Sequence, residues 1–420
     1  MVRWLLARRG IASDYNPRAM ARLLDGVLVL DFSRVLAGPF AAMLLAQLGA
    51  RVVKIEPPGG DESRGFGPFV GNQSLYFVGV NRGKEGLALN LKHPDGLDIA
   101  RRLADRADVL LENFRPGTLD RLGLGYDTLA ARNPRLIYCS LSGFGQFGPR
   151  SARGAYDVIV QAAAGLMGLT GPEGGPAVRV GASVGDLIPA LYAVIGIVAA
   201  LYQREQSGQG CVLDLAMQDA VVTMVEHALA RAWATGEDPQ PLGSRHPAIS
   251  PFAAFQTADS EVVVAAGNEA LWRQLCTALE RPDLADHPDY ATNALRTANA
   301  LALTGELTRT FQQRPTAEWL DLLDTAGVPA TRVARMSDLL ADEHLRARRA
   351  IQHFDQPGVG RVPVPGNPIK ASGYDDSVRG PAPAYGSDAE TILRDLLGMD
   401  EATIASLRES GAVLGGGDLP

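Results

Sequence analysis

Asp186 raises a question of chemistry, because it follows the Gly-rich segment GASVG and precedes an uncharged run from Leu187 to Tyr202. An aspartate directly before a helix caps it by accepting hydrogen bonds from the free N–H groups of the first turn. The positive end of the helix dipole also keeps such a carboxylate ionised when it is partly buried. An ionised carboxylate can attack an activated acyl group. Asp186 is therefore a helix cap, a nucleophile, or both.

The composition argues against several other classes of function. The 420 residues carry a formal net charge of −7, and 46% of them are hydrophobic. Such a chain lacks the basic surface of nucleic-acid-binding proteins and has no Lys/Arg run for a membrane surface. Its three cysteines are far apart, without a CxxC or histidine pattern, which indicates a reducing compartment and no structural zinc. We expect no nucleic-acid partner and no metal.

No membrane segment is predicted either. The uncharged run after Asp186 is shorter than the about 18 residues of a spanning helix, and it contains Pro189 and Gly196. This is typical of a buried core helix. Residues 1–19 are Arg-rich, but their apolar stretch WLLA is too short for a secretory signal. We expect a cytoplasmic protein in which residues 1–19 are an extension before Met20, with a mitochondrial transit peptide as the alternative.

The first half of the chain alternates β-branched runs with amphipathic stretches, the pattern of a parallel sheet covered by helices. Strands are predicted at 27–32, 51–56, 87–91, 108–113, 135–142 and 211–217, and helices at 41–49, 95–107 and 218–234. The first strand is followed by SRVLAGPF, which lacks the GxGxxG fingerprint of dinucleotide-binding folds. The predicted fold class is α/β with a Rossmann-like large domain, and an NAD role loses its main support.

The character of the sequence changes after this region. Residues 234–251 are rich in turn formers and predict a linker or binding loop. A hairpin is predicted at 252–268, turning at Asp259 and Ser260, followed by helices to about Ala326. We therefore predict a large domain over 1–225, a small α+β domain over 226–334, and a C-terminal segment over 335–420. This segment has too little apolar surface to fold alone, so we expect it to return to the large domain.

Several long motifs resemble one known family. They are LLDGVLVLDFSRVLAGPFAAMLLAQLGARVVKIEPPGGDESRGFGP (23–68), LENFRPGTLDRLGLGYDTL (111–129), YCSLSGFGQFGP (138–149), GAYDVIVQAAAGLMGLTG (154–171) and RHPAISPF (245–252). In this order they resemble the class III CoA-transferases, the CaiB/BaiF family, nearest to members that use dicarboxylates. The resemblance runs from about Leu23 to the C-terminus. It implies a ring-shaped chain that forms an intertwined homodimer.

The family's nucleophile is the aspartate after a short Gly-rich segment, which corresponds to Asp186. The resemblance implies that Asp186 attacks a donor such as succinyl-CoA, giving a mixed anhydride and CoA thiolate. An aspartyl-CoA thioester follows, the acceptor carboxylate attacks it, and CoA captures the new acyl group. Each attacking group is already an anion, so the protein supplies positioning, exclusion of water and oxyanion donors. Gly181 and Gly185 either let backbone N–H groups approach or form a simple turn.

Coenzyme A, the expected co-substrate, needs cations for its phosphates and an apolar slot for adenine. The resemblance points to the first strand-to-helix turn, to positions after later strands, and to one position near the acyl end. These are Val35, Leu36, Ala37, Leu89, Asn113, Phe114, Arg121 and Met217, with Arg64, Arg82 and Lys84 as weaker candidates. For each arginine the alternative is a solvated surface charge.

The resemblance also places Tyr156 and Asp157 in the active-site wall. Tyr156 either hydrogen-bonds a substrate carboxylate or is a half-buried core tyrosine. The similar α-methylacyl-CoA racemases carry a catalytic histidine in this triplet, which here is AYD. Without that histidine a two-base proton exchange lacks a partner for the aspartate, so racemase or isomerase is the alternative function. A catalytically silent CoA-binding protein is a third hypothesis.

The acceptor is predicted from departures from the family pattern. Arg34 lies where formyl-CoA transferases carry a different residue, and RHPAISPF replaces their Gly-rich loop. This argues against oxalate and formate and favours a larger acceptor. Arg34, Arg245 and His246 are candidates to hold the far carboxylate of succinate, glutarate, itaconate or a malate relative. For His246 the alternative is a loop histidine satisfied by the backbone.

Overall fold

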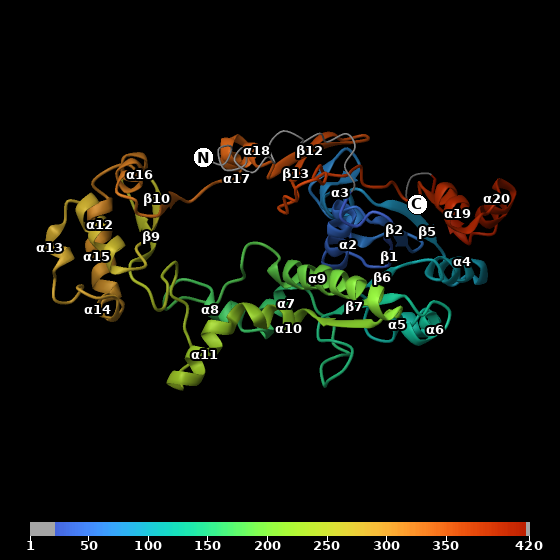
Figure 1. The fold of residues 1–420 in the computed structure, drawn as a ribbon, viewed down its shortest axis with the longest axis horizontal. Helices are drawn as coiled ribbons and strands as arrows, with labels where there is room; N and C mark the ends of the chain where they lie inside the picture. Colours follow the sequence, from blue (N-terminus) through green and yellow to red (C-terminus); the bar gives the residue numbers. More distant parts are fainter. Residues whose placement is uncertain (1–21, 417–420) are drawn as a thin grey trace. The chain divides into compact units, whose positions relative to one another are not determined.

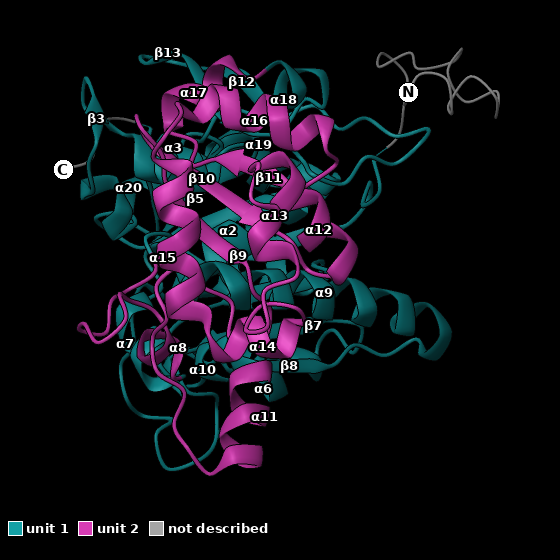
Figure 2. Cartoon of the chain, turned by 90° about the vertical axis from the view of Figure 1, so that its left-hand side faces the viewer, with its two compact units in different colours: residues 1–164, 181–226, 343–420 teal, residues 165–180, 227–342 magenta. Residues whose placement is uncertain are grey.

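The computed structural model describes residues 22–416, so the predictions made for residues 1–19 lie outside the described residues. Figure 1 shows the order of the helices and strands. The chain forms two compact units (Figure 2). The first contains the residues up to Ala164, Gly181–Glu226 and the chain from Glu343 onward, and the second contains Gly165–Val180 and His227–Asp342.

A seven-stranded sheet forms the centre of the first unit, in the order β14-β5-β2-β1-β6-β7-β8. The strands are β1 (Leu28–Asp31), β2 (Arg51–Glu56), β5 (Glu85–Leu89), β6 (Val109–Glu112), β7 (Ile137–Ser142), β8 (Val212–Ala216) and β14 (Val413–Leu414). Neighbouring strands are parallel, except that β14 is antiparallel to β5. Numbered along the chain, the parallel strands lie in the order 3-2-1-4-5-6, that of doubly wound dinucleotide-binding sheets. The predicted α/β class is confirmed.

The predicted strands of this sheet are all present, with ends that differ by one or two residues except for β2, which matches its range. The helices differ more. The first, α2 (Ala37–Leu48), begins earlier than predicted, because Pro39 stands in its first turn, where the missing N–H is not needed. The helix predicted at 218–234 is divided into α10 (Met217–Val222), the 3-10 turn η2 (Thr223–Val225) and α11 (Glu226–Thr235).

Helices cover both faces of this sheet. Leu28 and Leu30 belong to a core cluster with residues of α4 (Pro94–Ala104), α19 (Ala389–Leu397) and α20 (Glu401–Glu409). Val29 points to the opposite face, because successive strand residues alternate. On that face α2 and α9 (Val184–Ser207) contact each other, and α9 also contacts β7 and β8. The remaining elements of this unit are η1 (Glu62–Gly65), β3 (Phe69–Val70), β4 (Gln73–Ser74), α3 (Leu75–Asn81), α5 (Thr118–Arg121), α6 (Tyr126–Ala130), α7 (Asp157–Ala163), α18 (Glu343–Ala347), β12 (Ile351–Gln356) and β13 (Gly360–Pro365).

The helix α9 is buried on one face only, so the prediction of a buried core helix is wrong for its other face. Ala190, Ala193 and Ile197 are fully buried, whereas Ile195 is 62% and Tyr202 is 72% exposed. Among the described residues α9 alone has the length and apolar composition of a membrane span. A core helix can satisfy the same criterion, and the buried face of α9 packs on α2 and the sheet.

The second unit holds a three-stranded antiparallel sheet, β11 (Ala330–Arg332), β10 (Glu261–Ala265) and β9 (Phe252–Gln256). The predicted hairpin is confirmed, since Asp259 and Ser260 lie between β9 and β10. Its helices are α8 (Leu166–Leu169), nearly all of α11, α12 (Glu269–Ala278), α13 (Pro282–Ala285), α14 (Asn293–Ala298), α15 (Ala300–Phe311), α16 (Thr316–Thr325) and α17 (Met336–Ala341). Residues 165–180 group with this unit rather than with the stretch up to 225, because Gly171 and Glu173 contact Gly243 and Arg245.

Gly86 in β5 provides a test of how the C-terminal segment packs on the sheet. The backbone of Asp388 donates to the Gly86 carbonyl (3.0 Å), and a Cβ at Gly86 would lie 2.9 Å from the Ala384 carbonyl oxygen. We expect Gly86→Ala to lower the free energy of unfolding by about 1–3 kcal/mol, the cost of overpacking. Urea unfolding measures this. Gly305→Ala, at an open position in α15, is the control, and an equal effect of both changes would contradict the packing.

Candidate active site

The turn after β1 and the turn after β6 meet where the strand order of the sheet reverses. Ligands of open α/β sheets bind at this switch point, beyond the carboxyl ends of the strands. Here the backbone N–H of Arg34 donates to Asn113 Oδ1 (2.8 Å), and Asn113 Nδ2 donates to the Arg34 carbonyl (2.9 Å). One side chain therefore joins the two turns.

A pocket of about 140 Å³ lies at this point and is formed by the first unit alone. It brings together nine of the predicted site residues, Arg34, Val35, Leu36, Ala37, Asn113, Phe114, Tyr156, Asp186 and Met217. Arg115 and Arg153 also line it and were not predicted. These two arginines place cations beside the residues predicted for coenzyme A. The signal for Arg115 was its place in NFRPG, directly after Asn113 and Phe114.

Asp186 is the third residue of α9, with Ser183 at the N-cap, so the interpretation of Asp186 as the residue before the helix is wrong. The N–H of Gly185 donates instead to Asp157 Oδ1 (2.8 Å), which also accepts from Gln161 Nε2 (2.8 Å). Asp157 is 8% exposed and does not line the pocket. It caps the first turn of α9 from α7, while the partly buried Asp186 lines the pocket.

Gly185 is required by this contact. A Cβ there would lie 2.6 Å from the Asp157 carbonyl oxygen and 2.9 Å from Asp157 Oδ1. The close backbone approach predicted for glycines near Asp186 is thus between α9 and α7. Gly181, by contrast, has open space around its Cβ position.

Tyr76 and Ser142 are candidate hydrogen-bond donors that the sequence analysis missed. Burial raises the pKa of Tyr76 to about 12, and the charges of Asp186, Asp61 and Asp157 contribute. Tyr76 therefore keeps its hydroxyl proton, but it is not among the residues that line the pocket. Ser142 ends β7 and lines the pocket, and its buried Oγ has no hydrogen-bond partner within the described part of the chain. Tyr76 stands in none of the quoted motifs, and Ser142 stands in the motif at 138–149, which gave it no role.

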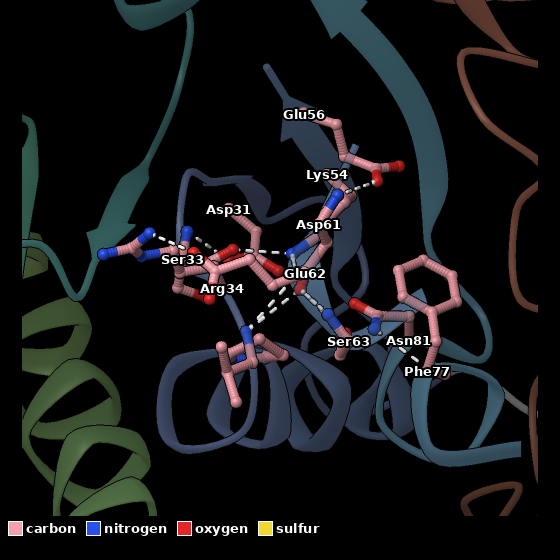
Figure 3. Close-up of polar contacts among 12 residues, drawn as sticks. Asp31, Ser33, Arg34, Lys54, Glu56, Asp61, Glu62, Ser63, Phe77 and Asn81 are labelled. Atoms are coloured by element: carbon pink, nitrogen blue, oxygen red, sulfur yellow. Dashed lines mark hydrogen bonds and ion pairs between the residues drawn. The ribbon is translucent and has the colours of Figure 1, made fainter. Parts of the chain in front are cut away.

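A buried set of ion pairs lies behind the turn after β1 (Figure 3). Lys54 Nζ is 2.6 Å from Asp61 Oδ2, and Lys84 Nζ is 2.7 Å from Asp31 Oδ2, with all four side chains at most 1% exposed. Burial would raise the pKa of Asp61, but Lys54 outweighs it and lowers that pKa to about 2. Burial lowers the pKa of Lys84 to about 8, against the attraction of Asp31. The charges are paired, as buried charges must be.

These ion pairs fix a strained backbone at the pocket. Val35 has a φ of 67°, a left-handed conformation that β-branched residues rarely adopt. Such a residue costs about 1–3 kcal/mol unless its surroundings determine it. Its N–H donates to both carboxylate oxygens of Asp61 (3.2 and 3.3 Å), and the preceding Ser33 carbonyl accepts from Lys54 (2.5 Å).

Several predicted site residues lie outside the pocket. Lys84 is in the core, and Arg64 binds Glu56 through two hydrogen bonds and stacks on Phe77. Arg82 donates to backbone carbonyls, and burial lowers its pKa to about 10. Leu89 packs in the core cluster of the sheet. Arg121 donates to Thr118 Oγ1 on α5 (3.1 Å). Arg121 and Arg64 pair with residues three and eight positions away, whereas Arg82 and Lys84 have partners distant in the chain, which the sequence pattern does not show.

Arg245 and His246 belong to the second unit, so the pocket of the first unit does not contain them. Arg245 pairs with Glu173 (2.5 Å). His246 Nδ1 accepts from the Ala248 N–H (3.1 Å), which is the backbone-satisfied alternative. Tyr156, in contrast, is 69% exposed where it lines the pocket, so the core-tyrosine alternative is wrong. No group of three or more His, Cys, Asp or Glu in residues 22–416 is placed to hold a metal ion.

Known proteins resemble this chain over most of its length. Residues 24–389 match the sequence pattern of a family described as "CoA-transferase family III". An acetyl-CoA:oxalate CoA-transferase from Acetobacter aceti is 44% identical, over 90% of this chain and 96% of that protein. The human succinyl-CoA:glutarate CoA-transferase is 39% identical, over 93% and 90%. The crystal structure of a CAIB/BAIF family protein from Brucella suis has a TM-score of 0.80 and 35% identity, covering 90% of this chain and 100% of that one.

Gly185→Ala tests whether the contact between α9 and α7 positions the pocket. The added methyl group would displace Asp157 or the first turn of α9, and a displacement of about 1 Å can lower a rate by about a hundredfold. We expect kcat to fall about tenfold or more, measured as transfer of CoA from a thioester to a free carboxylic acid. Gly196→Ala on the same helix meets only Leu213 Cδ1 at 3.4 Å and is the control. Equal activity of both variants would show that the contact is unimportant.

Proposed function

The chain belongs to CoA-transferase family III, and we propose that it moves coenzyme A from a donor such as succinyl-CoA to a dicarboxylic acid with Asp186 as its covalent nucleophile. The observation that carries this proposal is the position of Asp186. Its carboxylate lies in the first turn of α9 and lines the switch-point pocket with the residues predicted for coenzyme A. The relatives named above support the use of acyl-CoA donors and dicarboxylic acids.

In the proposed mechanism Asp186 attacks the thioester carbon and expels CoA thiolate. The positive end of the α9 dipole favours the ionised carboxylate that this attack needs. Ser142, whose buried Oγ has no hydrogen-bond partner within the described part of the chain, is the candidate donor for the oxygen that becomes negative in each tetrahedral intermediate. CoA thiolate then attacks the aspartyl carbonyl carbon of the anhydride and releases the donor acid, which leaves an aspartyl-CoA thioester. The acceptor carboxylate attacks this thioester and expels CoA thiolate. The thiolate finally attacks the acyl carbon of the acceptor, which gives the new acyl-CoA and frees Asp186. Each step replaces one activated acyl bond by another, so no proton has to be removed from carbon.

The cations and apolar residues of this pocket are candidates to contact coenzyme A. Arg115 and Arg153 replace the predicted Arg64 and Lys84 as candidate partners of its phosphates, since the latter two are paired elsewhere. The turn from Val35 to Ala37 precedes α2, and a helix N-terminus favours phosphate. Leu36, Phe114 and Met217 add apolar surface.

The racemase alternative lacks the catalytic histidine of the racemases, because Tyr156 occupies its position. The other carboxylate that lines the first unit's pocket, Glu62, is paired with Arg34. A two-base proton exchange needs a free base opposite the aspartate. The silent CoA-binding alternative predicts no covalent adduct on Asp186.

The contact between the protein and the acceptor acid is a second part of the proposal. Arg34 is half exposed, pairs with the half-exposed Glu62 (2.5 Å), and lies 5.6 Å from the Phe114 ring centre. We propose that the far carboxylate of the acceptor replaces Glu62 at Arg34. The sequence analysis argued against oxalate, but a relative 44% identical is named for oxalate, so short and long dicarboxylates are both candidates.

The exposed face of α9 supports the proposal of an intertwined homodimer. Leu191, Ile195 and Tyr202 on α9 are exposed, as are Val158 and Ile159 on α7. Large apolar side chains gathered on one surface mark interaction sites. A second copy of the chain is the partner that the family resemblance implies.

Replacing Asp186 tests the nucleophile. We expect Asp186→Asn to lower CoA exchange between succinyl-CoA and a panel of dicarboxylates by about three orders of magnitude or more, because an amide cannot form the anhydride. Wild-type protein incubated with succinyl-CoA should gain a CoA adduct in intact-mass spectra, which hydroxylamine removes. Asp127→Asn, in the first turn of α6, is the control. Undiminished exchange by Asp186→Asn would disprove the mechanism.

Replacing Arg34 tests the acceptor contact. A charge-assisted hydrogen bond contributes about 1.5–3 kcal/mol, so we expect Arg34→Ala to raise KM for dicarboxylates about tenfold to a hundredfold. KM for acetate, which has no second carboxylate, should change little. Glu62→Gln should lower KM for dicarboxylates, because Arg34 loses its competing partner. Equal effects on mono- and dicarboxylates would contradict this role of Arg34.

A further inference from the structure

Val35 is the one non-glycine residue that both lines the pocket of Asp186 and has a left-handed backbone, within the described residues. The other two such residues, Glu280 and Arg349, do not line it. Strained residues persist where the surrounding structure determines them, and they gather at functional sites. The contacts that hold Val35 therefore indicate which residues shape the pocket.

Three successive residues of this turn are held by side chains from elsewhere. Lys54 on β2 donates to the Ser33 carbonyl, and the Asn113 side chain binds both the backbone N–H and the backbone carbonyl of Arg34. The N–H of Val35 donates to Asp61. A change of φ at Val35 would break the bond to Asp61 and turn the backbone on either side of it.

Asp61 makes several hydrogen bonds besides those to Val35. Its carboxylate accepts from the Ser63 N–H (2.9 Å), from Ser63 Oγ (2.7 Å) and from Lys54 Nζ (2.6 Å), and its own N–H donates to Glu56 Oε2 (2.9 Å). Asp61 is 4% exposed. A carboxylate so placed cannot turn away from Val35 without losing several of these bonds.

Asp61 does not line the pocket, so it cannot act on substrate directly. We propose that Asp61 is a positioning residue, which holds Val35 in its left-handed conformation and so sets the backbone of Val35–Ala37 against the substrate bound at Asp186. Lys54 supports it by fixing the carboxylate and the Ser33 carbonyl at once. This inference rests on the proposed function, because it assumes that the pocket of Asp186 is the reacting site.

The substitution Asp61→Asn tests the proposal, because asparagine has the same shape but loses the charge and one acceptor oxygen. We expect kcat for CoA exchange to fall about tenfold to a hundredfold, since the backbone opposite Asp186 loses its fixed position. A purely structural role also predicts a loss, so a second change is needed. Val35→Gly supplies it, because glycine adopts a positive φ without strain.

In the double variant Asp61→Asn/Val35→Gly, we expect kcat to recover at least about threefold relative to Asp61→Asn alone. Glycine removes the cost of the left-handed conformation that Asp61 no longer compensates. Recovery in kcat without recovery in the urea midpoint would separate positioning from stability. Asp105→Asn, at the exposed pair with Arg132, is the matched control and should keep the wild-type rate.

Two outcomes would overturn the inference: a wild-type kcat in Asp61→Asn, or a double variant no faster than Asp61→Asn. If Asp61→Asn fails to fold, Ser63→Ala is used instead, because it removes one donor to Asp61 and keeps the pair with Lys54. We expect it to lower kcat by less than Asp61→Asn would, and adding Val35→Gly should restore kcat. Absence of that recovery overturns the inference. The wild type is measured in each experiment. Absence of exchange in the wild type would refute the proposed function, whereas an active wild type with these negative results would refute the role of Asp61 alone.

Discussion

The hydrogen bond from the N–H of Gly185 to the carboxylate of Asp157 is the contact on which the site depends. A helix leaves its first N–H groups without partners inside the helix, and the residue that caps them is normally the one just before it. Here the carboxylate comes from α7, so the first turn of α9 is joined to another helix. Asp186, the next residue, is thereby fixed at the pocket while a different carboxylate caps Gly185.

The turn after β1 meets the same need by other means. Dinucleotide-binding folds use glycines there, which let the backbone approach phosphate. In SRVLAGPF a valine takes the left-handed conformation, and Asp61 and Lys54 hold it. Only Gly38 is kept, because a Cβ there would lie 2.2 Å from Ser33 Cβ. Tertiary contacts rather than local propensity determine this turn, which explains how the strand order can be that of a nucleotide-binding sheet although the fingerprint is absent.

The sequence predicted what depends on neighbours in the chain. The strands follow from β-branched runs, and the hairpin around Asp259 follows from its turn residues. The failures involve partners far apart in sequence. Lys84 has a side chain that often binds phosphate, but it pairs with Asp31, 53 residues away. Asp157 caps a residue 28 positions later. The exposed face of α9 was missed because an uncharged run does not show whether its partner is the core or another surface.

The cations around the pocket fall into two groups with different tasks. Lys54 and Lys84 are buried in ion pairs with Asp61 and Asp31. Because removing either carboxylate would leave a buried charge without compensation, these cations hold the backbone and do not bind a ligand. Arg34 and Glu62 are half exposed, and such a pair contributes about 0–1 kcal/mol. A substrate anion can replace Glu62 at little cost. On the proposed function, this combination serves a transferase whose donor, acceptor and product acids are all anions: the backbone would stay in place while successive carboxylates bind at Arg34.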